Sequence, residues 1–217
     1  MNPDLYKNSR TYDFFLKLLG YEGSIVRFLS KLELDCPEDC RILDSGCGTG
    51  LLGLHFLDRF AKSTLTSTDL ESNLLDAVLA NADKRNLSRD RITLGTADIS
   101  NPGVVGALDG TTQRLADESF HLVCVGAVVG YATDTEESLR RLLTLLAPGG
   151  YLINIEMNES PTGRYVSRRF HYSNISIARM QDVIRDAGCT VEAKKFHVTD
   201  LPAKFTRTAI VARKPVA

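Results

Sequence analysis

The chain has 217 residues, of which 43% are hydrophobic and 24% charged, and its formal net charge is −1. This length fits one domain that buries roughly 70% of its unfolded surface, so folding needs neither disulfides nor a metal ion. The balanced charge gives no reason to expect a nucleic-acid or membrane partner. The longest nearly uncharged apolar run, residues 122–132, is too short to span a bilayer, and the amino-terminal segment has no apolar signal-peptide core.

The five cysteines are an odd count in a chain without a secretory signal, and they indicate reduced thiols in a cytoplasmic protein. Cys36 and Cys40 have no second pair of ligand residues nearby, so no metal site is expected.

Strands and helices alternate along the chain. In chain order, hydrophobic periodicity predicts a strand at 41–44, a helix at 51–61, a strand at 64–69, a helix at 72–86, a strand at 91–98, a strand at 120–129, a helix at 135–150, a strand at 151–156, a helix at 177–188, and strands at 190–198 and 205–213. Residues 1–38 precede this series, and amphipathic helix within 14–32 is expected to form a lid or flank.

The alternation favours a mostly parallel sheet with helices on both faces. Residues 199–204 are too few for a crossover helix, so the last two strands are expected to form an antiparallel hairpin. The predicted fold class is therefore α/β, with a seven-stranded sheet in a single domain whose core is 39–217. Ligands of such sheets bind at the carboxyl ends of the strands.

The stretch ILDSGCGTGLLGL (42–54) places Gly46, Gly48 and Gly50 between the first strand and the first helix. Glycines permit a tight turn and let a ligand contact the backbone, and the helix amino terminus then points at that ligand. A loop that only packs is an equally good interpretation of these glycines in isolation.

A dinucleotide fingerprint, GxGxxG, can also be read from Gly48, Gly50 and Gly53, with Asp69 about 20 residues further on. An NAD(P)-dependent oxidoreductase is therefore the formal alternative. Asp44 argues against it, because a carboxylate ahead of the glycines would repel a pyrophosphate. A terminal hairpin is also not expected in such a dehydrogenase.

The segment ILDSGCGTG resembles motif I of the class I S-adenosylmethionine-dependent methyltransferases, which have a Rossmann-like fold. Further matches follow in order at TSTDLES (66–72), TADI (96–99), DESFHLVCVGAVVGY (117–131) and LLAPGGYLINIE (145–156). The resemblance covers roughly residues 10–213 and includes the terminal hairpin. It implies S-adenosylmethionine as the cofactor.

Cofactor contacts follow from the resemblance residue by residue. It implies Asp44 and Gly46 near the methionine amino group, Gly48 and Gly50 at the close approach of the backbone, Asp69 and Leu70 at the ribose, Asp98 and Ile99 at the adenine, and Gly126 and Ala127 beside the methionine portion. Carboxylates suit a cofactor with a sulfonium, an ammonium and ribose hydroxyls. Because segment 100–114 is longer than usual in this family, Asp109 is an alternative to Asp98. His121 stands where the family has aspartate, at the strand end remote from the cofactor.

Acceptor contacts are expected from segments that overhang the carboxyl ends of the strands. Tyr131 and Glu156 end two strands near the expected methyl position, and His171 is the best general-base candidate because its ordinary pKa is near neutral. These three are the catalytic candidates. The segment 156–174 is expected to be a loop that either faces water or recognises an anionic acceptor through Arg164, Arg168 and Arg169.

The sequence thus predicts a methyltransferase for a small-molecule acceptor, with an anionic acceptor as one form of this hypothesis. A protein or nucleic-acid methyltransferase and a non-catalytic cofactor-binding protein of the same fold are the alternatives. The stretch GAVVGYA (126–132) lacks the Asn/Asp-Pro-Pro-aromatic signature of methylases that act on base amino groups.

Overall fold

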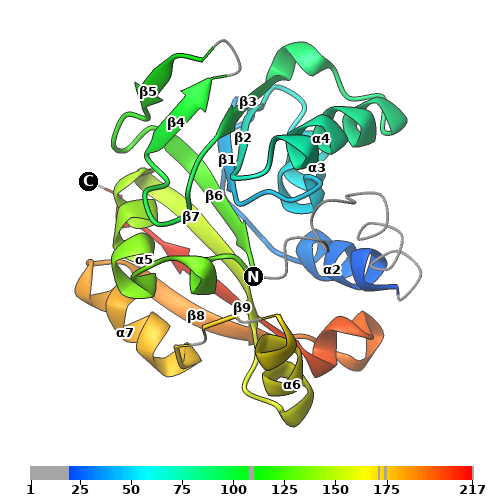
Figure 1. Ribbon diagram of the computed structural model, residues 1–217, viewed down its shortest axis with the longest axis vertical. Coiled ribbons are helices and arrows are strands. Elements are labelled where there is room, and N and C mark those ends of the chain that lie inside the picture. The colour runs from blue at the N-terminus through cyan, green and yellow to red at the C-terminus, as the bar shows by residue number, and fades with distance from the viewer. Residues whose placement is uncertain (1–19, 108–109, 171, 174, 217) are drawn as a thin grey trace.

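The computed structural model describes residues 20–107, 110–170, 172–173 and 175–216. Within them, nine strands form one sheet in the order β5-β4-β3-β2-β1-β6-β7-β9-β8 (Figure 1). The strands are β1 (Arg41–Ser45), β2 (Thr64–Asp69), β3 (Ile92–Thr96), β4 (Val104–Ala107), β5 (Thr112–Arg114), β6 (Phe120–Gly126), β7 (Leu146–Met157), β8 (Thr190–Lys195) and β9 (Arg207–Arg213). Neighbours from β3 to β7 run parallel. The predicted α/β class with a mostly parallel central sheet is confirmed.

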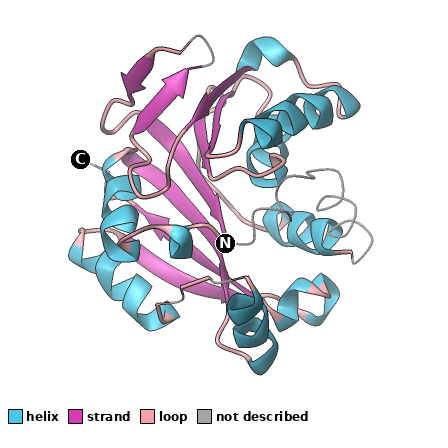
Figure 2. Cartoon of the chain, viewed as in Figure 1, coloured by secondary structure: helices cyan, strands magenta, loops and turns pink. Residues whose placement is uncertain are grey.

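Helices cover both faces of the sheet (Figure 2). One hydrophobic cluster packs α2, α3 and α4 against it through Phe28, Phe56 and Val78, and a second packs α5 and α7 through Leu139 and Met180. The helices are α2 (Tyr21–Ser30), α3 (Leu51–Arg59), α4 (Ser72–Lys84), α5 (Thr135–Thr144), α6 (Pro161–Arg169) and α7 (Ile177–Asp186).

In β6, the residues from 122 to 125 are all apolar because this strand is buried on both of its faces. Leu122 and Cys124 belong to the first cluster, and Val123 and Val125 belong to the second. Successive side chains of a strand point to opposite faces, so a strand between two helical layers buries all of them. This central position places the end of β6 at the middle of the carboxyl edge of the sheet.

The expected number of seven strands was wrong. β4 and β5 lie within segment 100–114, which had been expected to be a simple connection, and they extend the sheet beyond β3 as antiparallel strands. Both are short and contain glycine or polar residues, so hydrophobic periodicity does not reveal them. β8 pairs antiparallel with β9, but the connection carries two 3-10 turns, η3 (Val198–Asp200) and η4 (Ala203–Phe205). The sequence predicted a strand over 190–198, which includes His197. β8 instead ends at Lys195, and His197 lies outside it, directly before η3.

Two further boundaries differ from the prediction. The helix expected to run to residue 150 ends at Thr144, and β7 begins at Leu146 with a register shift against β6. The loop expected at 156–174 contains α6 instead. Ser160 caps α6 by accepting a hydrogen bond from the backbone N–H of Gly163, and Pro161 occupies its first turn, which is a favourable place for proline.

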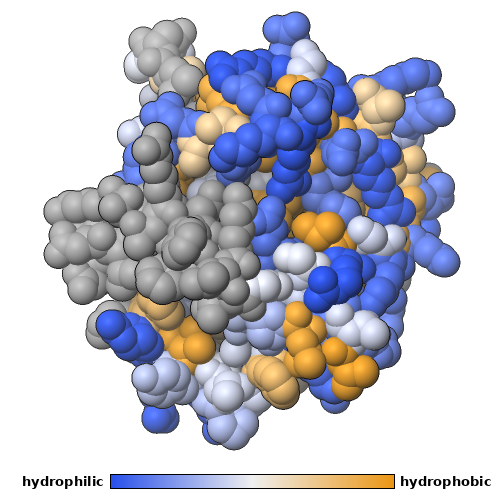
Figure 3. Space-filling view, turned by 90° about the vertical axis from the view of Figure 1, so that its right-hand side faces the viewer, coloured by the Kyte–Doolittle hydropathy of each residue, from blue (hydrophilic) through white to orange (hydrophobic). Residues whose placement is uncertain are grey.

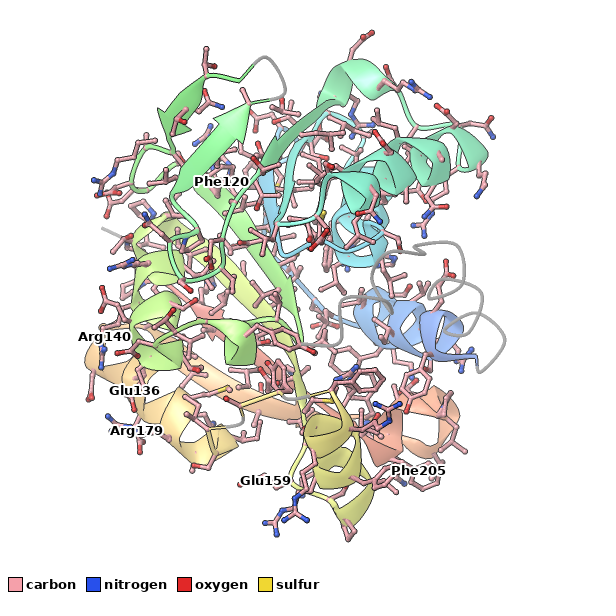
Figure 4. The ribbon with its side chains drawn as sticks, viewed as in Figure 1. Phe120, Glu136, Arg140, Glu159, Arg179 and Phe205 are labelled. Carbon is pink, nitrogen blue, oxygen red and sulfur yellow. The ribbon has the colours of Figure 1, made fainter. Side chains whose placement is uncertain are left out.

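An ion-pair cluster joins α5 to α7 on the outside of the molecule (Figure 4). Glu136 accepts from Arg179 of α7 at 2.7 Å and from Arg140 of its own helix at 3.2 Å. Such exposed pairs contribute little to stability, so the buried leucines of α5 dominate its packing.

Candidate active site

The glycine loop after β1 faces the end of β6. Gly46, Gly48 and Gly50 have φ values of +67°, +54° and +86°, in the left-handed region that favours glycine. A Cβ on Gly46 would lie 2.4 Å from the Val128 side chain, whereas a Cβ on Gly48 would meet nothing within 4 Å. Gly46 therefore permits the glycine loop to pack against the loop that follows β6, and the Gly48 backbone borders open space.

Asp44 is buried at the end of β1, with 1% of its surface exposed. One carboxylate oxygen accepts the backbone N–H of Gly53 at 2.8 Å. A Cβ on Gly53 would lie 2.8 Å from the same carboxylate, so a glycine is required for this contact. Burial raises the pKa of Asp44 to about 7, although the Gly53 hydrogen bond acts in the opposite direction. The carboxyl is thus poised to ionise when a positive charge approaches.

Asp69 connects the end of β2 to the glycine loop. Its two carboxylate oxygens accept the backbone N–H of Gly48 at 2.8 Å and of Glu71 at 3.1 Å. Burial raises the pKa of Asp69, and these backbone hydrogen bonds partly offset the rise. The carboxylate therefore holds the loop in place while still bordering the cleft.

The carboxyl edge of the sheet forms one cleft with two lobes. The lobes share Gly46, Gly48, Gly126 and Ala127. The first, here called the β3 lobe, is lined among others by Asp69, Leu70, Asp98, Ile99, Val128 and Tyr131. The second, here called the α2 lobe, is lined among others by Tyr21, Glu22, Asp44, Arg85, Ile155 and Arg207.

Nine of the ten predicted cofactor-binding residues line this cleft, and their contacts with a cofactor stay predictions. Gly50 is absent from the lining because it caps α3 and packs toward Leu54 and Val78. Asp98 lies just beyond β3 and is exposed within the β3 lobe. The alternative residue, Asp109, lies outside the described residues.

The three catalytic candidates have different surroundings. Tyr131 lines the β3 lobe, and its hydroxyl donates to the Phe170 carbonyl at 3.4 Å. Glu156 is fully buried and lines neither lobe, since its oxygens accept from the Tyr172 hydroxyl at 2.8 Å and the Met157 N–H at 2.7 Å. Burial raises the pKa of Glu156. His171 lies outside the described residues.

Tyr172 is a residue that the sequence patterns did not single out. Its hydroxyl donates to Glu156 and accepts the backbone N–H of Gly130 at 3.0 Å. Gly130 belongs to the 3-10 turn η2 (Val129–Tyr131), and the ring of Tyr131 meets the ring of Tyr172 edge to face. Glu156 and Tyr172 therefore support the turn that carries Tyr131, instead of facing the cleft themselves.

The other basic residues that the sequence analysis named lie outside the cleft. Arg164, Arg168 and Arg169 are exposed on α6, and they line neither lobe. His121 is the second residue of β6 and accepts the backbone N–H of Arg41 at 3.0 Å, so it lies at the amino end of the strand. Arg85 and Arg207, which do line the α2 lobe, were not among the predicted residues.

Within the described part of the chain, no group of three or more histidine, cysteine, aspartate or glutamate residues is placed to hold a metal ion. The same residues include no helix with the length and apolar character needed to cross a membrane.

The fold and the cleft define an α/β protein with a ligand-sized cleft across the carboxyl end of a mostly parallel sheet. A methyltransferase domain model matches residues 43–152, just over half of the chain. The chain therefore belongs to the methyltransferase domain family, in agreement with its resemblance to the class I S-adenosylmethionine-dependent enzymes. S-adenosylmethionine is the cofactor that this membership implies.

Individual proteins are similar to this chain in sequence or in fold. The chain is 31% identical over 139 residues to the reducing polyketide synthase Preu2 of Preussia isomera, covering 64% of the chain and 6% of that protein. It is 30% identical over 168 residues to a trans-aconitate 2-methyltransferase of Variovorax paradoxus, covering 75% of the chain and 53% of that protein. The chain thus spans about half or less of these relatives. A solved S-adenosylmethionine-dependent methyltransferase of Thermotoga maritima has the same fold, with a TM-score of 0.65, 19% identity and coverage of 99% and 100%.

The residues of the cleft fit S-adenosylmethionine. The Gly48 backbone borders open space, and the carboxyl groups of Asp44, Asp69 and Asp98 border the same cleft. These groups complement an ammonium, a pair of ribose hydroxyls and an adenine amino group. When bound, S-adenosylmethionine would supply a methyl group activated by a positively charged sulfur.

Proposed function

We propose that this chain is a methyltransferase that transfers the methyl group of S-adenosylmethionine to a small-molecule acceptor. The observation that carries the proposal is the continuity of the cleft. The β3 lobe, with Asp69 and Asp98, passes over Gly126 and Ala127 into the α2 lobe. One cleft can therefore hold a nucleoside at one end and leave room for a second reactant at the other.

The order of the strands supports one orientation of the cofactor. Asp98 follows β3 and Asp69 ends β2, so they suit the adenine and the ribose. Asp44 lies in the next strand, β1, where it suits the ammonium of the methionine portion. The reactive centre would then lie beside Ala127 at the end of β6, which has a positive φ of 51°. A strained backbone at this point is a sign of a rigidly formed site.

Placement of the acceptor can supply most of the catalysis, because methyl transfer is a displacement on an activated carbon. A general base is needed only if the acceptor loses its proton early. Tyr131 and His171 stay candidates for this role. The buried hydrogen bonds of Glu156 favour a positioning role for it, through Tyr172 and the η2 turn.

A small acceptor is supported by the chain's balanced charge and by the name of its relative, a trans-aconitate 2-methyltransferase. The described part of the face in Figure 3 is mainly hydrophilic, with apolar residues in small separate groups. We propose a cytoplasmic single domain over 1–217, in which α2 flanks the acceptor side. The lid expected from 1–38 rests partly on residues 1–19, which lie outside the described residues.

The test has a binding arm and a transfer arm. S-adenosylmethionine and S-adenosylhomocysteine should raise the melting temperature, whereas NADH and NADPH should not. Radiolabelled methyl from the donor should enter a small-molecule pool, and an Asp69→Ala variant should transfer much less. Label that enters only protein or nucleic acid would contradict the acceptor class, and a shift with nicotinamides alone would contradict the whole proposal.

A further inference from the structure

We infer that Arg207 selects the methyl acceptor by binding a carboxylate group on it, so that the substrate is a carboxylate-bearing small molecule. The inference rests on the proposed function and adds a substrate class and a specificity residue to it. Arginine suits this role because its planar guanidinium binds a carboxylate with two parallel hydrogen bonds.

The position of Arg207 places it on the acceptor side. It is the first residue of β9, which runs antiparallel to β7 and pairs with it there through Met157. The beginning of β9 therefore lies at the carboxyl edge, where Phe205 marks the same end of the strand (Figure 4). Arg207 and Ile155 line the α2 lobe beyond the ends of β1 and β6. The cofactor-facing strands lie on the other side of β6.

The charge of Arg207 is not consumed by a salt bridge to any described residue. Its hydrogen bond to a side chain goes to the Met157 sulfur, which is a weak acceptor. Burial raises the pKa of Glu156, and the charge of Arg207 opposes this rise only in part. The Glu156 oxygens accept from Tyr172 and Met157, so they form no salt bridge with Arg207. Arg85, the other cation of the lobe, forms a salt bridge with Glu22 at 3.3 Å. A half-buried guanidinium whose side-chain partner among the described residues is a sulfur is a favourable receptor for an anion.

The wall that carries Arg207 is well fixed. The Asn158 side chain donates to the Arg207 carbonyl at 3.3 Å. The hydroxyls of Tyr21 and Thr206 are hydrogen-bonded at 2.8 Å, which joins α2 to the residue before Arg207. These contacts fix the backbone that carries the Arg207 side chain, so its starting point beside the lobe is defined before an acceptor binds.

The α6 arginines provide a matched control. Arg168 is exposed and lines neither lobe, so the same substitution there removes an equal charge from outside the cleft. Arg207→Gln removes the charge, and Arg207→Lys keeps the charge but removes the two-pronged geometry. Thermal melts of each variant would show whether it folds.

The experiment uses the full chain saturated with S-adenosylhomocysteine, so that no methyl transfer occurs. Calorimetry at constant ionic strength compares trans-aconitate with its trimethyl ester, and malonate with malonamide. We expect the wild type to prefer the carboxylates. Arg207→Gln should weaken their binding roughly ten- to a hundredfold, Arg207→Lys should weaken it less, and Arg168→Gln should leave it unchanged. S-adenosylhomocysteine affinity should stay the same in all variants.

Two results would overturn the assignment. One is a wild type that binds both carboxylates no better than their neutral counterparts. The other is a folded Arg207→Gln variant that retains the wild-type preference. Failure of the wild type to bind S-adenosylhomocysteine is a separate outcome, which would refute the proposed function on which the inference rests.

Discussion

Cofactor binding should strengthen as pH rises toward neutrality, because Asp44 must ionise to attract the cofactor ammonium. Burial raises the pKa of this carboxyl to about 7 in the absence of ligand, and the nearby charge of Asp69 adds to the rise. A bound ammonium favours the ionised form and lowers the pKa again. Binding below about pH 7 should therefore release a proton, and Asp44→Asn should remove this release.

The size of the effect follows from the titration. Two pH units below its pKa, an acid is about 99% protonated, so the affinity at about pH 5 should be roughly a hundredfold weaker than its limit above about pH 8. The stability of the ligand-free protein depends on pH in the opposite direction to cofactor affinity. The raised pKa gives ligand-free Asp44 a stabilising contribution below its unfolded pKa of about 4, which is lost as pH rises through about 7. The ligand should therefore stabilise the protein more at the upper end of this range.

Calorimetry with S-adenosylhomocysteine at several pH values, in two buffers of different ionisation enthalpy, measures both affinity and proton release. Asn at position 44 has nearly the same volume as aspartate, and its amide oxygen can still accept from Gly53. Asp98→Asn serves as a control, because it changes a cleft residue that is exposed and should keep the pH dependence. The reasoning about Asp44 is refuted if Asp44→Asn binds with the same pH slope and proton release as the wild type.

Three further variants test separate parts of the site. Asp69→Ala should weaken S-adenosylhomocysteine binding by about 1.5–3 kcal/mol, measured by calorimetry, while Asp76→Asn on the exposed side of α4 should bind normally. Gly53→Ala should destabilise the fold by about 1–3 kcal/mol in urea unfolding, because its Cβ would lie 2.8 Å from neighbouring side chains, whereas Gly23→Ala in α2 should be neutral or stabilising. Tyr172→Phe should cost about 1–3 kcal/mol and lower methyl transfer, since it leaves two buried partners without their hydrogen bond; unchanged transfer would count against its support of η2.

The central strands could be predicted because their residues are buried on both faces. β1, β2 and β6 appear in the sequence as apolar or threonine-rich runs next to turn residues. β4 and β5 could not be found in this way, because strands of three or four residues at the margin of the sheet bury few side chains. α6 was missed since its periodicity is polar, although Ser160 followed by Pro161 is a recognisable helix start.

Nine of the ten residues that the sequence assigned to the cofactor line the cleft, whereas the basic residues of the α2 lobe, Arg85 and Arg207, were not singled out. Asp44, Asp69 and Asp98 stand at or just after the ends of predicted strands, where the chain itself fixes their place. Arg207 also stands at a strand end, but at the beginning of an antiparallel strand. The first residue of an antiparallel strand lies at the carboxyl edge of its parallel neighbours, and this rule would have singled out Arg207. The sequence patterns instead indicated the arginines of segment 156–174, which lie closer together.

This contrast has a physical origin. The proposed cofactor contacts come from adjacent parallel strands and their glycine turn, which share one hydrogen-bonded ladder and one pair of hydrophobic clusters. Their relative positions are therefore set by the same forces that fold the sheet. The proposed acceptor side is assembled from α2 and the start of β9, and the η2 turn borders the neighbouring β3 lobe. These parts are joined by single contacts such as Tyr21 with Thr206 and Tyr172 with Gly130. Such contacts can change without unfolding the core, so one stable cofactor site can be combined with different acceptor walls, and the substrate has to be inferred from the walls themselves.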